Sequence, residues 1–242
     1  MSISRQTGPA RGNSLVAMLT AEGLRLLSAE SRVDWLAEGD TLSTAAGPTD
    51  HVYFPFESVV SGLSELGDGQ SVEAITVGSE GIVGLSLSIY GHDSVLRWEV
   101  LVAGDALRVP GPAFRAELAR ESTFAEGCRR YAGVLAHDVV TTLSCNALHS
   151  LSARYARWLL LLSDRLGEDL PVTQERAAAM LGVSRQSVSA VVGDFRREGL
   201  IAQARGHIRI VNREGIEDQS CSCYWNLTGR PGGARERIPS RR

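Results

Sequence analysis

The sequence contains no lysine, so all 25 of its basic residues are arginines. We attribute this chiefly to genomic base composition, although arginine is also the better bidentate partner for carboxylate, phosphate and guanine. Cysteine is scarce as well. Four cysteines, at positions 128, 145, 221 and 223, cannot build a dense disulfide framework, so a reducing cytoplasm is the expected compartment.

Long apolar runs are missing too. No segment approaches the roughly 18 to 20 consecutive apolar residues that a membrane helix needs, and residues 1–14 lack the apolar core of a secretory signal. With 43% hydrophobic and 22% charged residues, the 242-residue chain is long enough to bury a core in one or two domains. We therefore expect a folded cytoplasmic protein without a membrane segment.

Signatures of common enzyme sites are also absent. The chain has no GxSxG, GxxxxGK[ST], HExxH or strand-linked GxGxxG motif, and we expect no enzymatic activity and no cofactor. Cys145 and His149 lie four residues apart, and Cys221 and Cys223 form a close pair. Two such pairs are a weak metal pattern, so buried or incidental thiols are expected rather than a metal site.

A charge asymmetry divides the chain. Residues 171–242 carry 12 arginines and 7 acidic residues, a net charge of +5, whereas residues 1–170 carry 13 arginines and 21 acidic residues, a net charge of −8. A mildly acidic body with a basic C-terminal part is typical of a polyanion-binding module attached to another domain.

The first half of the chain reads as β structure, after a short helix expected around Leu15–Leu27. An Asp-Gly turn at 67–69 lies between two β-rich stretches, which predicts a hairpin. Many short strands with glycine turns and no helices between them indicate an antiparallel barrel or sandwich. The β-rich stretches are 51–63, 72–77, 98–102 and 106–109.

A helical region follows from Ala113 to about Gly167. It predicts a short helix, a long one over roughly Phe124–His149, and a third from about Leu151. One face of the long helix alternates spacings of four and three, as a coiled-coil seam does. That face either packs on the helix's own domain or forms a dimer. Its residues are Cys128, Ala132, Leu135, Val139, Thr142 and Asn146.

A segment near the C-terminus carries the strongest functional signal. Thr173 is a good N-cap for a first helix, Gly182 supplies a tight turn, and Ser184 can cap a second helix that ends at Gly199. Two short helices joined through a glycine are the helix-turn-helix pattern. The second helix would turn its apolar side inward with Val188, Val191, Val192 and Phe195.

The second helix and a following hairpin over 202–211 would supply DNA contacts. The N-terminal part of such a helix enters the major groove, where Arg185 would read guanine and Gln186 adenine. The hairpin, turning at Arg205-Gly206, reads as a wing with phosphate-contacting side chains. The candidate DNA-binding residues are Thr173, Ser184, Arg185, Gln186, Ser187, Ser189, Arg205, His207 and Arg209.

This segment resembles the DNA-binding domain of the Crp/Fnr regulator superfamily. The resemblance rests on Thr173, Ala177 and the stretches 182–188 and 199–201, and on the preceding helix residues 153–160. Upstream, the stretches 53–55, 67–69 and 78–84 are similar to landmarks of that family's cyclic-nucleotide-type β-roll.

The resemblance covers roughly residues 15–220 and implies an α+β fold. Its expected parts are a flexible N-terminus (1–14), an antiparallel, jelly-roll-like β-roll sensor domain (15–122), a dimerisation helix (123–150), a winged helix-turn-helix (151–224) and a disordered tail (225–242). It implies a transcriptional regulator that binds palindromic double-stranded promoter DNA as a homodimer, with RNA polymerase as a partner.

The sequence departs from the family's cyclic-nucleotide binders. Ile82 stands where those proteins carry a ribose-binding glutamate, and Trp98 replaces the hydroxyl residue after Arg97. Because an apolar side chain cannot accept the ribose hydrogen bond, we expect no dependence on cyclic AMP. The candidate effector pocket is Gly81, Ile82, Val83, Arg97 and Trp98, its ligand unidentified.

Two further departures concern the cysteines and the recognition helix. No cysteine precedes Cys128, which excludes the family's N-terminal iron–sulfur cluster. Gln186 and Ala190 stand where family members commonly carry glutamate and arginine, which predicts an unusual DNA half-site. The alternative function is a small-molecule, metal or redox sensor whose β-roll carries the main activity.

Overall fold

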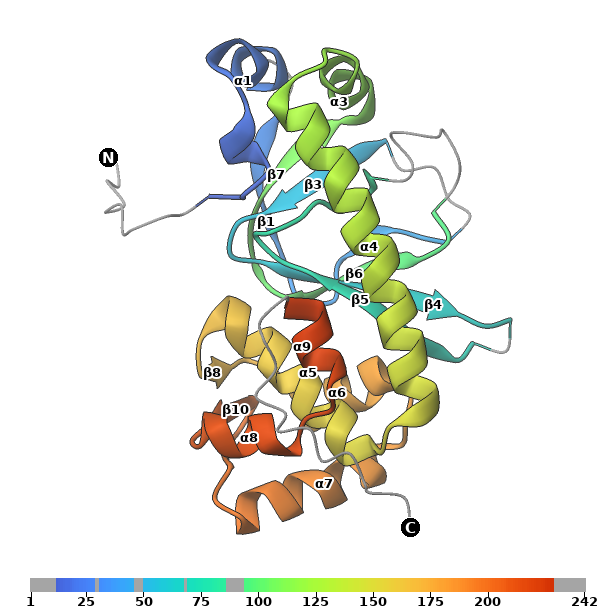
Figure 1. Ribbon diagram of the computed structural model, residues 1–242, viewed down its shortest axis with the longest axis vertical. Coiled ribbons are helices and arrows are strands. Elements are labelled where there is room, and N and C mark those ends of the chain that lie inside the picture. The colour runs from blue at the N-terminus through green and yellow to red at the C-terminus, as the bar shows by residue number, and fades with distance from the viewer. Residues whose placement is uncertain (1–11, 29–30, 46–49, 68, 86–93, 229–242) are drawn as a thin grey trace, which may run out of the picture. The chain divides into compact units, whose positions relative to one another are not determined.

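The computed structural model describes residues 12–28, 31–45, 50–67, 69–85 and 94–228 (Figure 1). The chain divides into two compact units. The first comprises residues 1–65 and 76–134, and the second comprises residues 66–75 and 135–242.

The first unit is built on antiparallel β structure, as predicted. One sheet has the order β1-β7-β3 and the other the order β2-β6-β4-β5, and β5 begins in the second unit and ends in the first. The strands are β1 (Arg32–Leu36), β2 (Thr41–Ser43), β3 (His51–Pro55), β4 (Val59–Glu65), β5 (Ser71–Val77), β6 (Arg97–Val102) and β7 (Gly104–Pro110).

The core of this unit follows from strand alternation. In the antiparallel pair β3–β7, Val52 lies opposite Val109 and Phe54 opposite Leu107. Val52, Phe54 and Val109 are fully buried, because alternate residues of a strand face one side. The ring of Phe54 lies 6.0 Å from the rings of Phe114 and Phe124, which joins the sheet to the helices that follow it.

The predicted strand over 51–63 is wrong in one respect, because two strands occupy it. β3 ends at Pro55 and β4 begins at Val59. Between them the backbone N–H of Phe56 and the hydroxyl of Ser58 both donate to the carbonyl of Asp105, at 2.9 and 3.2 Å. These bonds turn the chain after Pro55 and break the continuous strand that β-propensity alone predicts. The sequence did not predict β1 and β2 either.

The N-terminal region also differs from its prediction. The helix expected around Leu15–Leu27 is a 3-10 turn, η1 (Val16–Met18), followed by α1 (Ala21–Ser28). The sequence assigned residues 12–14 to a flexible segment, but here they form part of the fold. The amide of the buried Asn13 donates to the carbonyls of Pro55 and Gly81 at 3.2 and 2.6 Å. Residues 1–11 lie outside the described residues.

The predicted helical region is confirmed. It contains α3 (Gly111–Leu118), α4 (Thr123–Leu148) and α5 (Leu151–Leu166). α4 starts in the first unit and ends in the second. Its face singled out from sequence is buried or half-buried in the folded chain, at Cys128, Ala132, Leu135, Val139, Thr142 and Asn146. Much of that face is therefore covered within the single chain.

The second unit contains a helix-turn-helix, a wing and two C-terminal helices (Figure 1). Its small sheet has the order β8-β10-β9. Residues 225–228, expected in a disordered tail, complete α9, while 229–242 lie outside the described residues. The elements are β8 (Asp169–Leu170), α6 (Gln174–Leu181), α7 (Arg185–Arg197), β9 (Ile201–Ala204), β10 (His207–Ile210), α8 (Arg213–Gln219) and α9 (Cys223–Thr228).

Candidate nucleic-acid interface

The two helices of the motif are joined by the turn that the sequence predicts. Thr173 caps α6 by accepting a hydrogen bond from the N–H of Arg176 at 3.1 Å. Gly182 ends α6 in the left-handed conformation, with φ of +63°, which glycine adopts without a steric cost. A side chain at Gly182 would also lie 3.2 Å from Val72. The left-handed backbone therefore favours glycine at this position, and Val72 leaves little room for a side chain there.

The second helix, α7, presents an apolar and a polar side. Val188, Val192 and Phe195 are fully buried, and Val191 is half-buried. The ring of Phe195 lies 5.8 Å from the ring of Tyr155 on α5. This packing fixes the rotation of α7 about its axis, and so determines which residues of the helix face solvent.

The polar side carries the predicted base-reading residues. Arg185, Gln186 and Ser189 are exposed, and Arg185 and Gln186 are the first two residues of α7. This is the part of a recognition helix that reaches base edges in the major groove. Arginine and glutamine offer bidentate hydrogen bonds to guanine and adenine. The structure thus places both side chains where the sequence analysis expects them.

The hydroxyl groups of the motif are already engaged within the chain. Ser184 accepts a hydrogen bond from the N–H of Ser187 at 3.1 Å, and the two hydroxyl oxygens lie 2.9 Å apart. Ser184, like Thr173, caps its helix, and the hydroxyl of Ser187 lies against that cap. Each cap occupies only one backbone N–H of the first turn. The other N–H groups at the helix start can therefore bind a phosphate.

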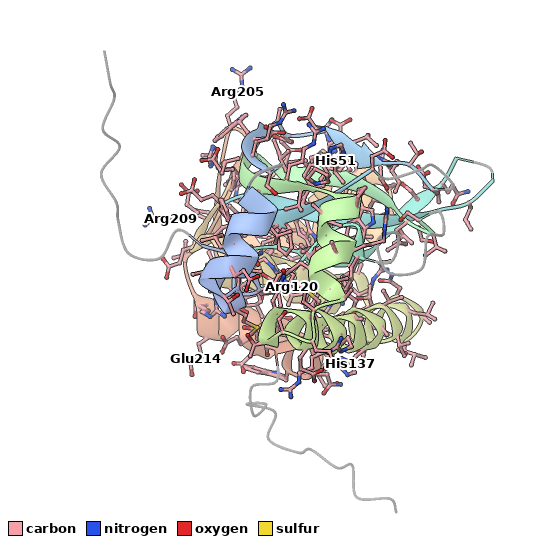
Figure 2. The ribbon with its side chains drawn as sticks, turned by 90° about the horizontal axis from the view of Figure 1, so that it is seen from above. His51, Arg120, His137, Arg205, Arg209 and Glu214 are labelled. Atoms are coloured by element: carbon pink, nitrogen blue, oxygen red, sulfur yellow. The ribbon has the colours of Figure 1, made fainter. Side chains whose placement is uncertain are left out.

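The wing is a hairpin of β9 and β10, completed by β8. Arg205, His207 and Arg209 are exposed, whereas the alternating residues Ile208 and Ile210 are buried. Figure 2 shows the side chains of Arg205 and Arg209 pointing outward. The imidazole Nδ1 of His207 lies 3.4 Å from a carboxylate oxygen of Asp169. The wing therefore offers two exposed arginine side chains and a histidine beside an acid.

The structure brings four of the predicted residues together. A hollow of about 310 Å³ is lined by Thr173, Arg185, Arg205 and His207, from α6, α7 and the wing. Sequence reasoning missed two glutamines that line it. The amide of Gln174 donates to the side-chain oxygen of Gln203 at 3.0 Å. Gln174 follows the N-cap directly, and this position was the only signal that could have identified it.

The candidate effector residues lie in the β unit. Ile82 and Val83 are fully buried, and Val83 pairs with Tyr53 through two backbone hydrogen bonds of 2.9 and 3.0 Å. Arg97 binds Glu65 at 2.6 Å and also Glu99. Val83 is therefore joined to β3, and the Arg97 guanidinium is already held by two carboxylates.

The remaining effector candidates are also closely packed. A side chain at Gly81 would collide with the phenol of Tyr131. Trp98 is buried, and within the described part of the chain its indole N–H has no hydrogen-bond partner.

A second group of side chains gathers where no site was expected. The ligand atoms of Cys145, His149, Cys221 and Cys223 all lie within 4.8 Å of one another. The hydrogen bond between Cys145 and Cys221 raises the pKa of the Cys145 thiol and lowers the pKa of the Cys221 thiol. Cys128 lies elsewhere, and burial raises its pKa to about 12.

Known proteins resemble the chain most clearly in the second unit. Residues 153–219 match the family described as the Crp-like helix-turn-helix domain. A stretch of 79 residues is 38% identical to the transcriptional regulator LdrP of Thermus thermophilus, and it covers 30% of this chain and 40% of that protein. The chain therefore matches less than half the length of this curated relative.

Solved structures extend the similarity to the first unit. A Crp/Fnr-family transcriptional regulator from Eubacterium rectale superposes with a TM-score of 0.68 at 18% identity, over 85% of this chain and 97% of that one. FixK2 from Bradyrhizobium japonicum has a TM-score of 0.68 at 14% identity, over 79% and 98% of the two chains. The β-roll, the long helix and the helix-turn-helix are thus a shared fold. Among the described residues, no helix is long and apolar enough to cross a membrane.

Proposed function

We propose that the chain is a sequence-specific DNA-binding transcriptional regulator of the Crp/Fnr type, because residues 153–219 match the Crp-like helix-turn-helix domain and the fold is that of a solved Crp/Fnr-family regulator. One observation carries the proposal. The first two residues of α7, Arg185 and Gln186, are exposed while the apolar side of the same helix is buried. The proposed activity is binding, not catalysis.

The proposed complex uses the two kinds of contact that DNA offers. Arg185 reads a guanine and Gln186 an adenine in the major groove. Arg205 and Arg209 on the wing contact phosphates, which position the domain without reading sequence. Because those contacts release counterions, affinity falls as salt concentration rises. His207, whose imidazole lies beside Asp169, contributes less charge than the two arginines.

We propose a homodimer held by α4, through a different face from the row that begins at Cys128. Val140 and Leu143 are 61% and 68% exposed. They belong to an apolar row with alternating spacings of three and four, which is the seam of a coiled coil. The row, called here the exposed seam, is Gly133, Ala136, Val140, Leu143 and Ala147, all exposed.

A symmetric dimer has consequences for its target. Two recognition helices related by a two-fold axis read a palindrome whose half-sites lie about one helical turn apart. Action at promoters implies RNA polymerase as a partner and the cytoplasm as the compartment. The pairing of Arg97 with Glu65 and Glu99 supports independence from cyclic AMP, because a cyclic phosphate would have to displace two carboxylates.

The proposal is tested by selecting bound sequences from a randomised duplex pool with the purified, effector-free full chain. We expect an enriched palindrome, and loss of enrichment at one position per half-site when Arg185→Ala is used. Arg197→Ala is the matched control, since Arg197 is an exposed arginine in the last turn of the same helix. Absence of enrichment at any salt concentration with the folded protein would contradict DNA recognition by α7.

A further inference from the structure

Four side chains in the second unit form a compact group that the DNA-binding proposal does not use. Cys145 and His149 lie at the end of α4, and Cys221 and Cys223 lie where α8 gives way to α9. The four ligand atoms all lie within 4.8 Å of one another. We propose that Cys145, His149, Cys221 and Cys223 form a tetrahedral binding site for a single Zn²⁺ ion.

The distances fit one tetrahedral ion. Zn–S bonds of about 2.3 Å and Zn–N bonds of about 2.0 to 2.1 Å imply about 3.8 Å between two sulfurs and about 3.6 Å between a sulfur and a nitrogen. In the chain, the sulfurs of Cys145 and Cys221 are 3.4 Å apart. The sulfur of Cys223 lies 3.6 Å from Nδ1 of His149. An iron–sulfur cluster spreads its ligands over several irons, which this compact group does not allow.

The donor set selects the metal class. Three thiols and an imidazole are soft and borderline ligands, which favour Zn²⁺ over the oxygen-binding ions Mg²⁺ and Ca²⁺. Four protein ligands complete the coordination and leave no open position, as in structural zinc sites. The three cysteines are buried and His149 is half-buried, so solvent does not compete at most of the site.

A buried cation beside the group supplies a second, independent observation. Arg157 is only 4% exposed, its guanidinium donates to the hydroxyl of Thr142 at 3.2 Å, and in the described part of the chain no carboxylate pairs with it. Its positive charge acts on all three cysteines. A Zn²⁺ ion with three thiolates carries one net negative charge, which would compensate the buried guanidinium.

The backbone holds the ligands in place before any metal binds. The N–H of His149 donates to the carbonyl of Cys145 at 3.1 Å, so both side chains leave one face of the last helical turn. The phenol of Tyr224, next to Cys223, donates to Asp164 of α5 at 2.9 Å and accepts from Arg213 at 2.7 Å. The C-terminal helices are therefore anchored on α5 independently of the metal.

The site is tested on the full chain with any affinity tag removed. We expect about one Zn²⁺ per chain by elemental analysis after gel filtration. Co²⁺ added to the chelator-treated protein should give the visible bands of tetrahedral coordination and a thiolate charge-transfer band. Cys221→Ser, Cys223→Ser and His149→Ala should each weaken Zn²⁺ binding by at least about tenfold.

Two controls separate the site from general damage. Cys128→Ser removes a buried cysteine outside the group and should keep the full metal content. His149→Ala changes a half-buried side chain, so it should fold, as judged by circular dichroism, even where a buried cysteine variant does not. Zinc bound equally well by the folded His149→Ala and Cys223→Ser variants would overturn the proposal. So would absence of both Zn²⁺ and the Co²⁺ spectrum, an iron–sulfur absorption in anaerobically purified protein, or zinc loss in Cys128→Ser alone.

Discussion

Leu143 has the largest side chain of the exposed seam and tests the proposed dimer directly. Its side chain is 68% exposed in the single chain, and a partner helix would cover it. Leu143→Ala removes three carbon groups, each worth about 0.8 kcal/mol when buried. Scaled by the 68% that is exposed, the loss is about 1.6 kcal/mol per chain. A dimer contains two copies, so the loss is about 3 kcal/mol, or roughly a 100-fold weaker dimerisation constant.

Sedimentation equilibrium over a dilution series measures this change. Leu66→Ala is the matched control, because Leu66 is a leucine of similar exposure, 63%, that does not lie on α4. It should leave the dimerisation constant unchanged. A shift of less than about threefold for Leu143→Ala, or an equal shift for both variants, would refute a dimer held by the exposed seam. Neither result is compatible with a dimer interface that buries Leu143.

Three further predictions concern the reading of DNA and the stability of each unit. Arg185→Ala should reduce discrimination at one base pair by about 1 to 3 kcal/mol, whereas Arg209→Ala should weaken binding to all DNA sequences alike and reduce the salt dependence of the affinity by about one unit of slope. Anisotropy titrations at several salt concentrations distinguish the two variants, and identical profiles would contradict these roles. Gly182→Ala should lower the unfolding free energy measured in urea by about 1 to 2 kcal/mol, because alanine is strained at a φ of +63°. Gly193→Ala, in open space within α7, is the control and should be neutral or stabilising. Phe114→Ala should cost about 3 to 5 kcal/mol in unfolding free energy, since its fully buried ring contacts two other aromatic rings; a loss below 1 kcal/mol would mean that the cavity collapses.

The helix-turn-helix could be predicted from sequence because its determinants are local. Thr173 and Ser184 cap their helices within three residues, and Gly182 adopts the one backbone conformation that the turn requires. Periodicity then decides which residues of α7 are buried. Each of these signals acts within one or two helical turns, and for that reason the exposed position of Arg185 and Gln186 followed directly.

Non-local contacts could not be predicted in the same way. The break between β3 and β4 depends on Asp105, which accepts hydrogen bonds from residues some fifty positions earlier in the chain. The sequence left two roles open for the face of α4 that begins at Cys128, because spacing identifies an apolar row without saying what covers it. On α4 two such rows exist, and only the packing of the folded chain separates the buried row from the exposed seam.

The cysteine–histidine group illustrates the same limit at a site. Cys145 and Cys221 are 76 positions apart in the chain, and their sulfurs are 3.4 Å apart in space. Neither the pair at 145 and 149 nor the pair at 221 and 223 forms a complete ligand set alone. Folding brings the pairs together only because α8 and α9 return to α5, through the bonds that join Arg213 and Tyr224 to Asp164.

The proposed zinc site and the recognition helix rest on the same helix, α5. Ala153 packs against the cysteines. Further along α5, the rings of Tyr155 and Trp158 pack together, and Tyr155 also packs against Phe195 of α7. Both aromatic side chains are essentially fully buried, and a close-packed interior has low compressibility and transmits strain. A Zn²⁺ ion that holds the cysteines against Ala153 would therefore also constrain the part of α5 on which α7 packs, and we expect the metal to stiffen the base of the recognition helix.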